Sequence, residues 1–78
     1  MNQIESLDRL FNPSSIAVIG ASNDRRKSGG RFVSGLISGN YRGRVYPVNP
    51  RESEIMGLTS YPRVTDIPAE IDLALVAV

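Results

Sequence analysis

The first apolar residues of the chain follow a helical period and are then interrupted. Four of them recur at the spacing of one helix face: Ile4, Leu7, Leu10 and Phe11. The sequence Asn-Pro-Ser at 12–14 then supplies residues that end helices and start turns. We therefore expect residues 1–13 to form an N-terminal helix and a linker.

The next part of the chain alternates between strand and helix patterns. A short β-branched apolar run at 15–19 predicts a strand that ends at Gly20. A polar loop follows, and apolar residues at helical spacing predict a helix over 30–38, with Gly-Asn at 39–40 as its stop signal. Residues 44–49 predict a second strand. The distance between the two strands is that of one βαβ unit, although Pro47 is unusual inside a strand.

The rest of the chain carries weaker signals. We expect a short helix over 52–56, a short strand over 58–61, and a helical turn or loop over 66–70 with Asp66 as its cap. A final strand begins near Ile71, and its apolar residues continue on both faces, which is typical of a strand covered on both sides.

Strands alternating with helices indicate an α/β, Rossmann-like parallel sheet over residues 14–78. Because a covered strand normally leads into another helix, we expect a doubly wound domain that is truncated at its C-terminus. A small protein that completes itself by dimerising is the alternative.

Composition narrows the possible chemistry. The 78 residues include no cysteine and no histidine, and the formal net charge is +1. Thiolate chemistry and a phosphohistidine are therefore excluded within this chain, and the balance of charge does not favour nucleic acid as a partner. No apolar run is long enough to span a bilayer, so we expect a soluble, cytoplasmic protein without a membrane partner.

The segment after the first strand carries the clearest candidate site. Gly20, Ala21 and Ser22 follow the strand directly, and Gly29 stands near the start of the helix. In parallel sheets such a turn presents backbone N–H groups and the positive end of a helix dipole to a phosphate. Lys27 and its two basic neighbours lie in the same loop and could contact that phosphate. The glycines are spaced more widely than in the G-x-G-x-x-G motif.

The end of the second strand argues against NAD. Enzymes that use NAD place an acid there to hold the ribose hydroxyls, whereas this chain has Asn49, Pro50 and Arg51. Arg51 suits a phosphate on the ribose, which occurs in both NADP and coenzyme A (CoA), and Asn49 could bond a ribose or a base. The residues therefore leave these two cofactors open.

Several motifs occur in the order found in one family. They are Asn-Pro-Ser-Ser-Ile-Ala-Val-Ile-Gly-Ala-Ser at 12–22, Gly29, Gly-Arg-Val-Tyr-Pro-Val-Asn-Pro at 43–50, Gly-Leu at 57–58, Tyr-Pro at 61–62, Ile-Pro at 67–68 and Ile-Asp-Leu-Ala at 71–74. Nearly the whole chain after residue 10 thus resembles the N-terminal CoA-binding domain of ADP-forming acyl-CoA synthetases, relatives of the succinyl-CoA synthetase α subunit.

The resemblance implies a Rossmann-like fold that binds CoA or an acyl-CoA, with Gly20, Ala21 and Ser22 in the phosphate loop and a basic residue at Arg51. It also implies a partnership with the other domains or subunit of a ligase. Those parts would bind ATP or ADP and carry the phosphorylated histidine that this chain lacks. Two further hypotheses remain open, namely an NADP-binding piece of a reductase and a non-catalytic nucleotide-sensing module.

Overall fold

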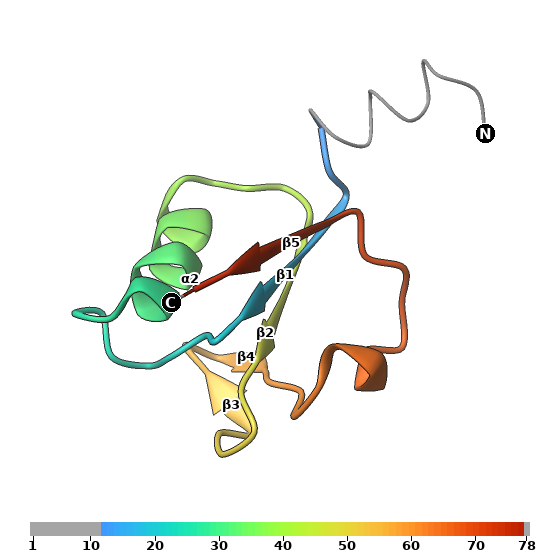
Figure 1. The fold of residues 1–78 in the computed structure, drawn as a ribbon. Helices are drawn as coiled ribbons and strands as arrows, with labels where there is room; N and C mark the ends of the chain where they lie inside the picture. The colour runs from blue at the N-terminus through green and yellow to red at the C-terminus, as the bar shows by residue number, and fades with distance from the viewer. Residues whose placement is uncertain (1–11, 78) are drawn as a thin grey trace, which may run out of the picture.

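The computed structural model describes residues 12–77 (Figure 1). Its elements are β1 Ser15–Ile19, α2 Ser28–Ser38, β2 Arg44–Val48, β3 Glu54–Ile55, β4 Leu58–Thr59, the 3-10 helix η1 Val64–Asp66, and β5 Leu73–Val76. The helix expected near the N-terminus lies outside the described residues.

A three-stranded parallel sheet organises the chain, with β1 between β2 and β5 (Figure 1). The register places Val18 opposite Pro47 on one side and opposite Leu75 on the other. The strand-helix-strand order β1, α2, β2 confirms the expected βαβ unit and the α/β class.

The two faces of the sheet pack against different parts of the chain. Ile16 and Val18 pack with Val33 of α2 and with Ile55 of β3. Ala17, on the opposite face, packs with Val48 and Ile67. Because β1 is covered on both faces, the four residues after Ser15 are all apolar.

The last strand differs from this pattern. Leu73 and Leu75 pack against the core that contains Val18, whereas Ala74 and Val76 are exposed in the structure. Within residues 12–77 this strand is therefore covered on one face only. The segment around Ile67 covers the second face of the sheet, where it packs against Ala17 and Val48. It does not cover Ala74 and Val76 of β5.

Pro47 fits in β2 because its missing N–H faces away from β1. The Val48 carbonyl points toward β1 and accepts the amide of Gly20, while the Pro47 carbonyl points the other way and accepts the amide of Tyr61 at 3.0 Å. In a strand the N–H and C=O of one residue face the same edge, and those of the next residue face the other edge. The nitrogen of Pro47 therefore faces away from β1, and no hydrogen bond to β1 is lost.

A hairpin replaces the helix expected over 52–56. Strands β3 and β4 pair antiparallel around Met56 and Gly57, whose φ angles are 50° and 82°. Two consecutive positive φ angles make the tight turn that suits the twist of a hairpin. Asn23 holds it from the loop after β1, because its side chain donates to the Glu54 carbonyl and accepts the Met56 amide. Gly57 therefore forms part of the turn that leads into β4 and does not close a helix.

Two other boundaries also shift. Helix α2 begins at Ser28, two residues before the predicted start, and ends at Ser38 as expected. The helical turn expected at 66–70 lies at 64–66, so Asp66 ends a 3-10 helix and does not cap one. Asp66 instead forms an exposed ion pair with Arg63, three residues before it, at 3.3 Å.

Two buried serines differ in how their hydroxyls are used, which yields a matched prediction. The Ser15 hydroxyl donates to the Glu70 carbonyl and accepts the Asp72 amide. The Ser60 hydroxyl has no hydrogen-bond partner in the described part of the chain. We expect Ser15→Ala to lower the free energy of unfolding by about 1 kcal/mol, and Ser60→Ala to leave it unchanged or raise it. Urea denaturation of the two variants tests this, and equal losses would contradict it.

Gly29 and Gly35 on α2 provide a second prediction. A Cβ on Gly29 would collide with the Gly20 carbonyl, whereas a Cβ on Gly35 would meet nothing within 4 Å. We expect Gly29→Ala to lower the free energy of unfolding by about 1–3 kcal/mol through overpacking. Gly35→Ala should raise it by about 0.5–1 kcal/mol, because alanine favours a helix. Urea denaturation distinguishes them, and a stable Gly29→Ala variant would show that the helix does not need this close approach.

Candidate functional site

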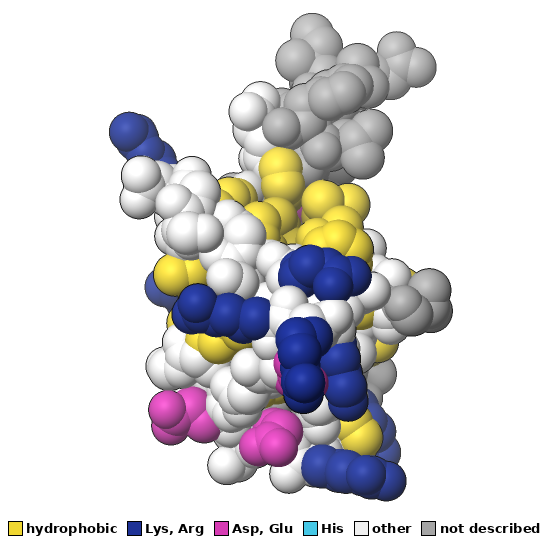
Figure 2. All heavy atoms as spheres, turned by 90° about the vertical axis from the view of Figure 1, so that its left-hand side faces the viewer, with side chains coloured by type: hydrophobic (Ala, Val, Ile, Leu, Met, Phe, Trp, Pro, Cys, Tyr) yellow, Lys and Arg dark blue, Asp and Glu magenta, His cyan; other side chains and the backbone are white. Residues whose placement is uncertain are grey.

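A pocket lies where the carboxyl ends of β1 and β5 meet the start of α2. It encloses about 330 Å³ and is lined by Gly20, Arg26, Lys27, Ser28, Gly29, Arg31 and Ala77. Ligands of open parallel sheets bind at this edge. Figure 2, which views the molecule from the side of α2, shows Lys and Arg side chains gathered close together on this face.

Gly20 makes the turn that leaves β1. Its φ angle of 85° favours glycine, and a Cβ there would also come within 2.8 Å of the Ala77 carbonyl oxygen. The amides of Gly20 and Ala21 both donate to the Val48 carbonyl, at 3.0 and 3.2 Å. The expectation that this turn presents free amides to a ligand is therefore wrong, because β2 already occupies them.

The start of α2 is where an anion could meet the backbone. Lys27 is the N-cap residue, its side chain makes no capping hydrogen bond, and no acidic residue stands in the first helical turn. No acidic side chain in this turn offsets the positive end of the helix dipole.

Gly29 and Gly30 bring the loop directly against this helix start. Both residues are buried, and a Cβ on either would collide with a backbone carbonyl, that of Gly20 for Gly29 and that of Asp24 for Gly30. The observed role of Gly29 is therefore close packing beside the pocket that it also lines.

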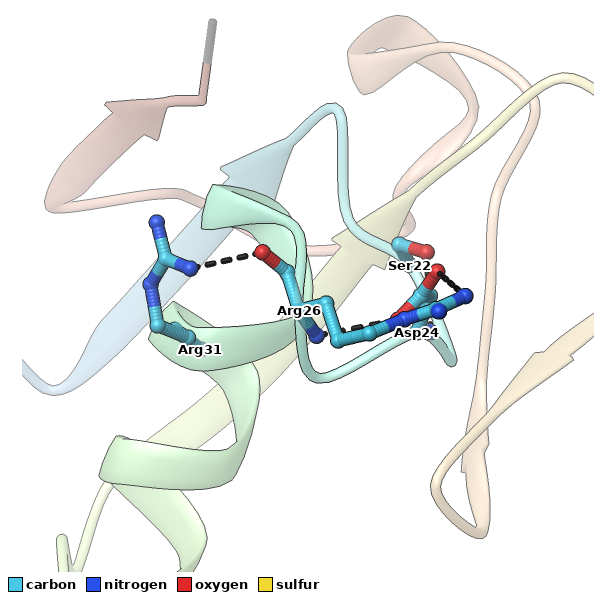
Figure 3. A network of polar contacts seen from close by, with 4 residues as sticks. All are labelled: Ser22, Asp24, Arg26 and Arg31. Carbon is cyan, nitrogen blue, oxygen red and sulfur yellow. Dashed lines mark hydrogen bonds and ion pairs between the residues drawn. The ribbon is translucent and has the colours of Figure 1, made fainter.

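An internal ion pair shapes the loop between Ser22 and Arg26 (Figure 3). The Asp24 amide donates to the Ser22 hydroxyl oxygen, and the Asp24 carboxylate accepts both the Arg26 amide and the Arg26 guanidinium, the latter through two bonds of 3.0 Å. The guanidinium, followed by the Arg26 amide, lowers the pKa of Asp24 below its ordinary value. The Arg26 side chain thus faces Asp24, and the Ser22 hydroxyl proton remains able to donate.

Arg31 belongs to this site although the sequence did not single it out. Its Nη1 donates to the Arg26 carbonyl at 2.6 Å, and its Nη2 makes a long contact of 3.5 Å with the Ser28 hydroxyl. Figure 3 shows the Arg31 side chain reaching back along α2 to the loop. Had the helix been predicted to begin at Ser28, Arg31 would have been recognised as a candidate, because a residue one turn after Lys27 lies beside the helix N-terminus.

Asn49 connects the end of β2 to the loop after β1. Its side-chain amide donates to the Ala21 carbonyl at 2.9 Å, and its side-chain oxygen accepts the amides of Arg51 and Glu52. These contacts use both ends of the side chain within the protein. Ala21 itself is fully buried.

The predicted site residues thus fall into four groups. Gly20, Lys27 and Gly29 line the pocket, whereas Ala21 and Asn49 support its walls through hydrogen bonds. Ser22 holds the loop. Arg51 lies exposed on the turn after β2, outside the residues that line the pocket.

Two searches of the described residues bear on other kinds of site. Between residues 12 and 77 no three His, Cys, Asp or Glu side chains are arranged to hold a metal ion. None of the helices found in that range is long and apolar enough to cross a membrane.

Comparison with known proteins gives a consistent result. Residues 14–78 match the family described as the CoA binding domain. The chain is 51% identical over 73 residues to the acetate–CoA ligase [ADP-forming] II subunit alpha of Pyrococcus furiosus, covering 92% of this chain and 16% of that protein. It is 45% identical over 75 residues to acetate–CoA ligase [ADP-forming] II of Archaeoglobus fulgidus, covering 96% of this chain and 11% of that protein.

A solved structure agrees with these matches. The apo form of the dinucleotide-forming acetyl-coenzyme A synthetase 1 of Candidatus Korarchaeum cryptofilum superimposes with a TM-score of 0.88 at 50% identity, over 92% of this chain and 16% of that one. The chain therefore spans about a sixth or less of these relatives. The match over residues 14–78, the identities and the shared fold together show that this chain belongs to the family of CoA-binding domains found in ADP-forming acetyl-CoA synthetases.

Proposed function

We propose that the chain binds CoA with the pyrophosphate in the pocket at the start of α2. The observation that carries this proposal is that one pocket joins the start of α2, where Lys27 makes no side-chain capping bond, to the basic residues Arg26, Lys27 and Arg31. Helix dipole and side-chain charges act in the same direction there, and both favour a phosphate. The loop residues Gly20, Ser22 and Gly29 give this pocket its shape.

Arg51 supports the second part of the proposal, which is recognition of the 3′-phosphate on the CoA ribose. It follows β2, whose carboxyl end lies at the same sheet edge as that of β1. Its backbone amide is fixed by the Asn49 side chain at 2.7 Å, which holds the turn while the guanidinium is exposed. Asn49 contributes by holding this turn against the loop after β1.

We propose further that the chain serves as the CoA-binding part of an acid–CoA ligase of the ADP-forming type in the cytoplasm, with residues 14–78 as the portion of the domain present. The sequence has no histidine, so phosphoryl transfer and the handling of ATP or ADP would fall to other domains or a partner subunit. The relatives named as ADP-forming acetate–CoA ligases support this assignment.

Substitution of Arg51 tests the ligand and its orientation. We expect Arg51→Ala to weaken CoA binding about tenfold while leaving dephospho-CoA unaffected, because a charge-assisted hydrogen bond to the 3′-phosphate is lost. Isothermal titration calorimetry measures both dissociation constants. Arg42→Ala is the matched control, since Arg42 precedes β2 at the amino ends of the strands. Equal weakening toward both ligands would contradict the role of Arg51, and wild-type binding of NADPH without CoA would favour the reductase alternative.

The loop that forms the pocket should also respond to acid. Because Arg26 lowers the pKa of Asp24 in the folded state, the ionised carboxylate stabilises the fold above its ordinary pKa, and this contribution disappears as pH falls through the folded pKa. We expect Asp24→Asn to be less stable than wild type near neutral pH, and the difference to shrink toward zero in acid. Urea denaturation between about pH 7 and about pH 3 measures the difference. Glu52→Gln, which removes an exposed carboxylate elsewhere, is the control, and a gap that stays constant with pH would refute the expectation.

A further inference from the structure

The charges around the pocket are not equivalent. The Arg26 guanidinium makes two bonds to the Asp24 carboxylate, so its charge is largely balanced within the loop. Arg31, in contrast, donates to neutral oxygen atoms, the Arg26 carbonyl and the Ser28 hydroxyl. The positive charge left to attract an anion into the pocket therefore resides mainly on Lys27 and Arg31.

Arg31 also differs from Lys27 in how firmly it is held. Its bond to the Arg26 carbonyl is short, at 2.6 Å, and it crosses from the first turn of α2 back to the loop. The side chain of a helical residue points toward the N-terminus, so this reach needs no distortion of α2. The guanidinium is thus oriented before any ligand arrives, which reduces the side-chain entropy lost on binding.

The hydrogen bond between Arg31 and the Arg26 carbonyl has a second consequence. Arg26 is one of the residues that line the pocket, and an unpaired carbonyl oxygen beside a phosphate would repel it. Arg31 covers that oxygen with one N–H group. A guanidinium has five N–H donors, and the two contacts observed leave further donors for a ligand.

We propose that Arg31 is a specificity-determining residue that contacts the pyrophosphate of CoA. The inference rests on the proposed function, and it assigns the pyrophosphate to Arg31 where the 3′-phosphate is assigned to Arg51. Arg31 thereby selects ligands with a pyrophosphate whether or not the ribose carries a phosphate. A planar guanidinium suits this task because it can donate two parallel bonds to neighbouring phosphate oxygens.

The test compares two variants against two ligands. Arg31→Gln should weaken CoA and dephospho-CoA by the same factor, about tenfold, whereas Arg51→Ala should weaken CoA alone. The ionic-strength dependence of the dissociation constant should also become shallower in Arg31→Gln, because one charged contact is gone. Arg42→Ala again serves as the control for loss of one exposed positive charge.

A second variant separates ligand contact from structural support. Arg31→Lys keeps the charge and one donor for the Arg26 carbonyl, so it should fold as wild type does, yet it lacks the planar fork. We expect it to bind both ligands about threefold more weakly. Phosphorus NMR of bound CoA should show altered pyrophosphate resonances and an unaltered 3′-phosphate resonance. A residue with a purely structural role would change the free energy of unfolding without this selective shift.

The outcomes distinguish the two proposals. Failure of the wild-type chain to bind CoA and dephospho-CoA overturns the proposed function and this inference with it. Normal binding by wild type together with unchanged dissociation constants in both Arg31 variants overturns the inference alone. Weakening restricted to CoA in Arg31→Gln would also overturn it, because Arg31 would then read the 3′-phosphate.

Discussion

The Val48 carbonyl is the point on which the arrangement of the site depends. It accepts the amides of Gly20 and Ala21 together, so the chain leaving β1 is tied to the last residue of β2 before the loop begins. That constraint sets the positive φ of Gly20 and fixes the direction in which the loop departs. The Asn49 side chain repeats the connection one residue later, through the Ala21 carbonyl. These three hydrogen bonds join segments that are distant in the sequence, so the loop starts from a rigid base.

Glycine spacing then determines how the loop returns to the sheet. Gly29 and Gly30 allow the first turn of α2 to lie directly against backbone carbonyls of Gly20 and Asp24, where no Cβ would fit. This contact brings the N-terminus of α2 to the carboxyl ends of β1 and β5. The glycines therefore act mainly through packing, and the candidate anion site is a consequence of the close approach that they permit.

Sequence reasoning succeeded where one physical requirement dominated a segment. Burial on both faces of β1 favours a short apolar run rich in β-branched residues, and the bounds of that strand were predicted correctly. The helix end at Ser38 was also clear, because Gly39 and Asn40 follow it and Asn40 adopts a positive φ. The hairpin around Met56 was missed because its turn is held by Asn23, more than thirty residues earlier, and no local pattern carries that contact. Likewise, the sequence shows that residue 20 is a glycine, but it does not show which carbonyl accepts the hydrogen bond from the Gly20 amide.

The hydrogen bonds at the turn after β1 also explain why side chains supply most of the candidate site. In a short glycine-rich turn, free backbone amides can bind a phosphate without help from side chains. Here the two amides at the turn are bonded to Val48, and the longer loop over residues 20–27 places charged side chains beside the helix start instead. Backbone amides bind phosphate groups without distinguishing between them. Arginine side chains at separate positions can each bind a different phosphate group. A CoA-like ligand carries phosphate at two sites, so the contacts proposed for Arg31 on α2 and Arg51 after β2 would recognise the separation of the phosphates as well as their charge. The wide spacing of the glycines thus agrees with the proposal that selectivity comes from Arg31 in the pocket and from Arg51 outside it, and not from the turn itself.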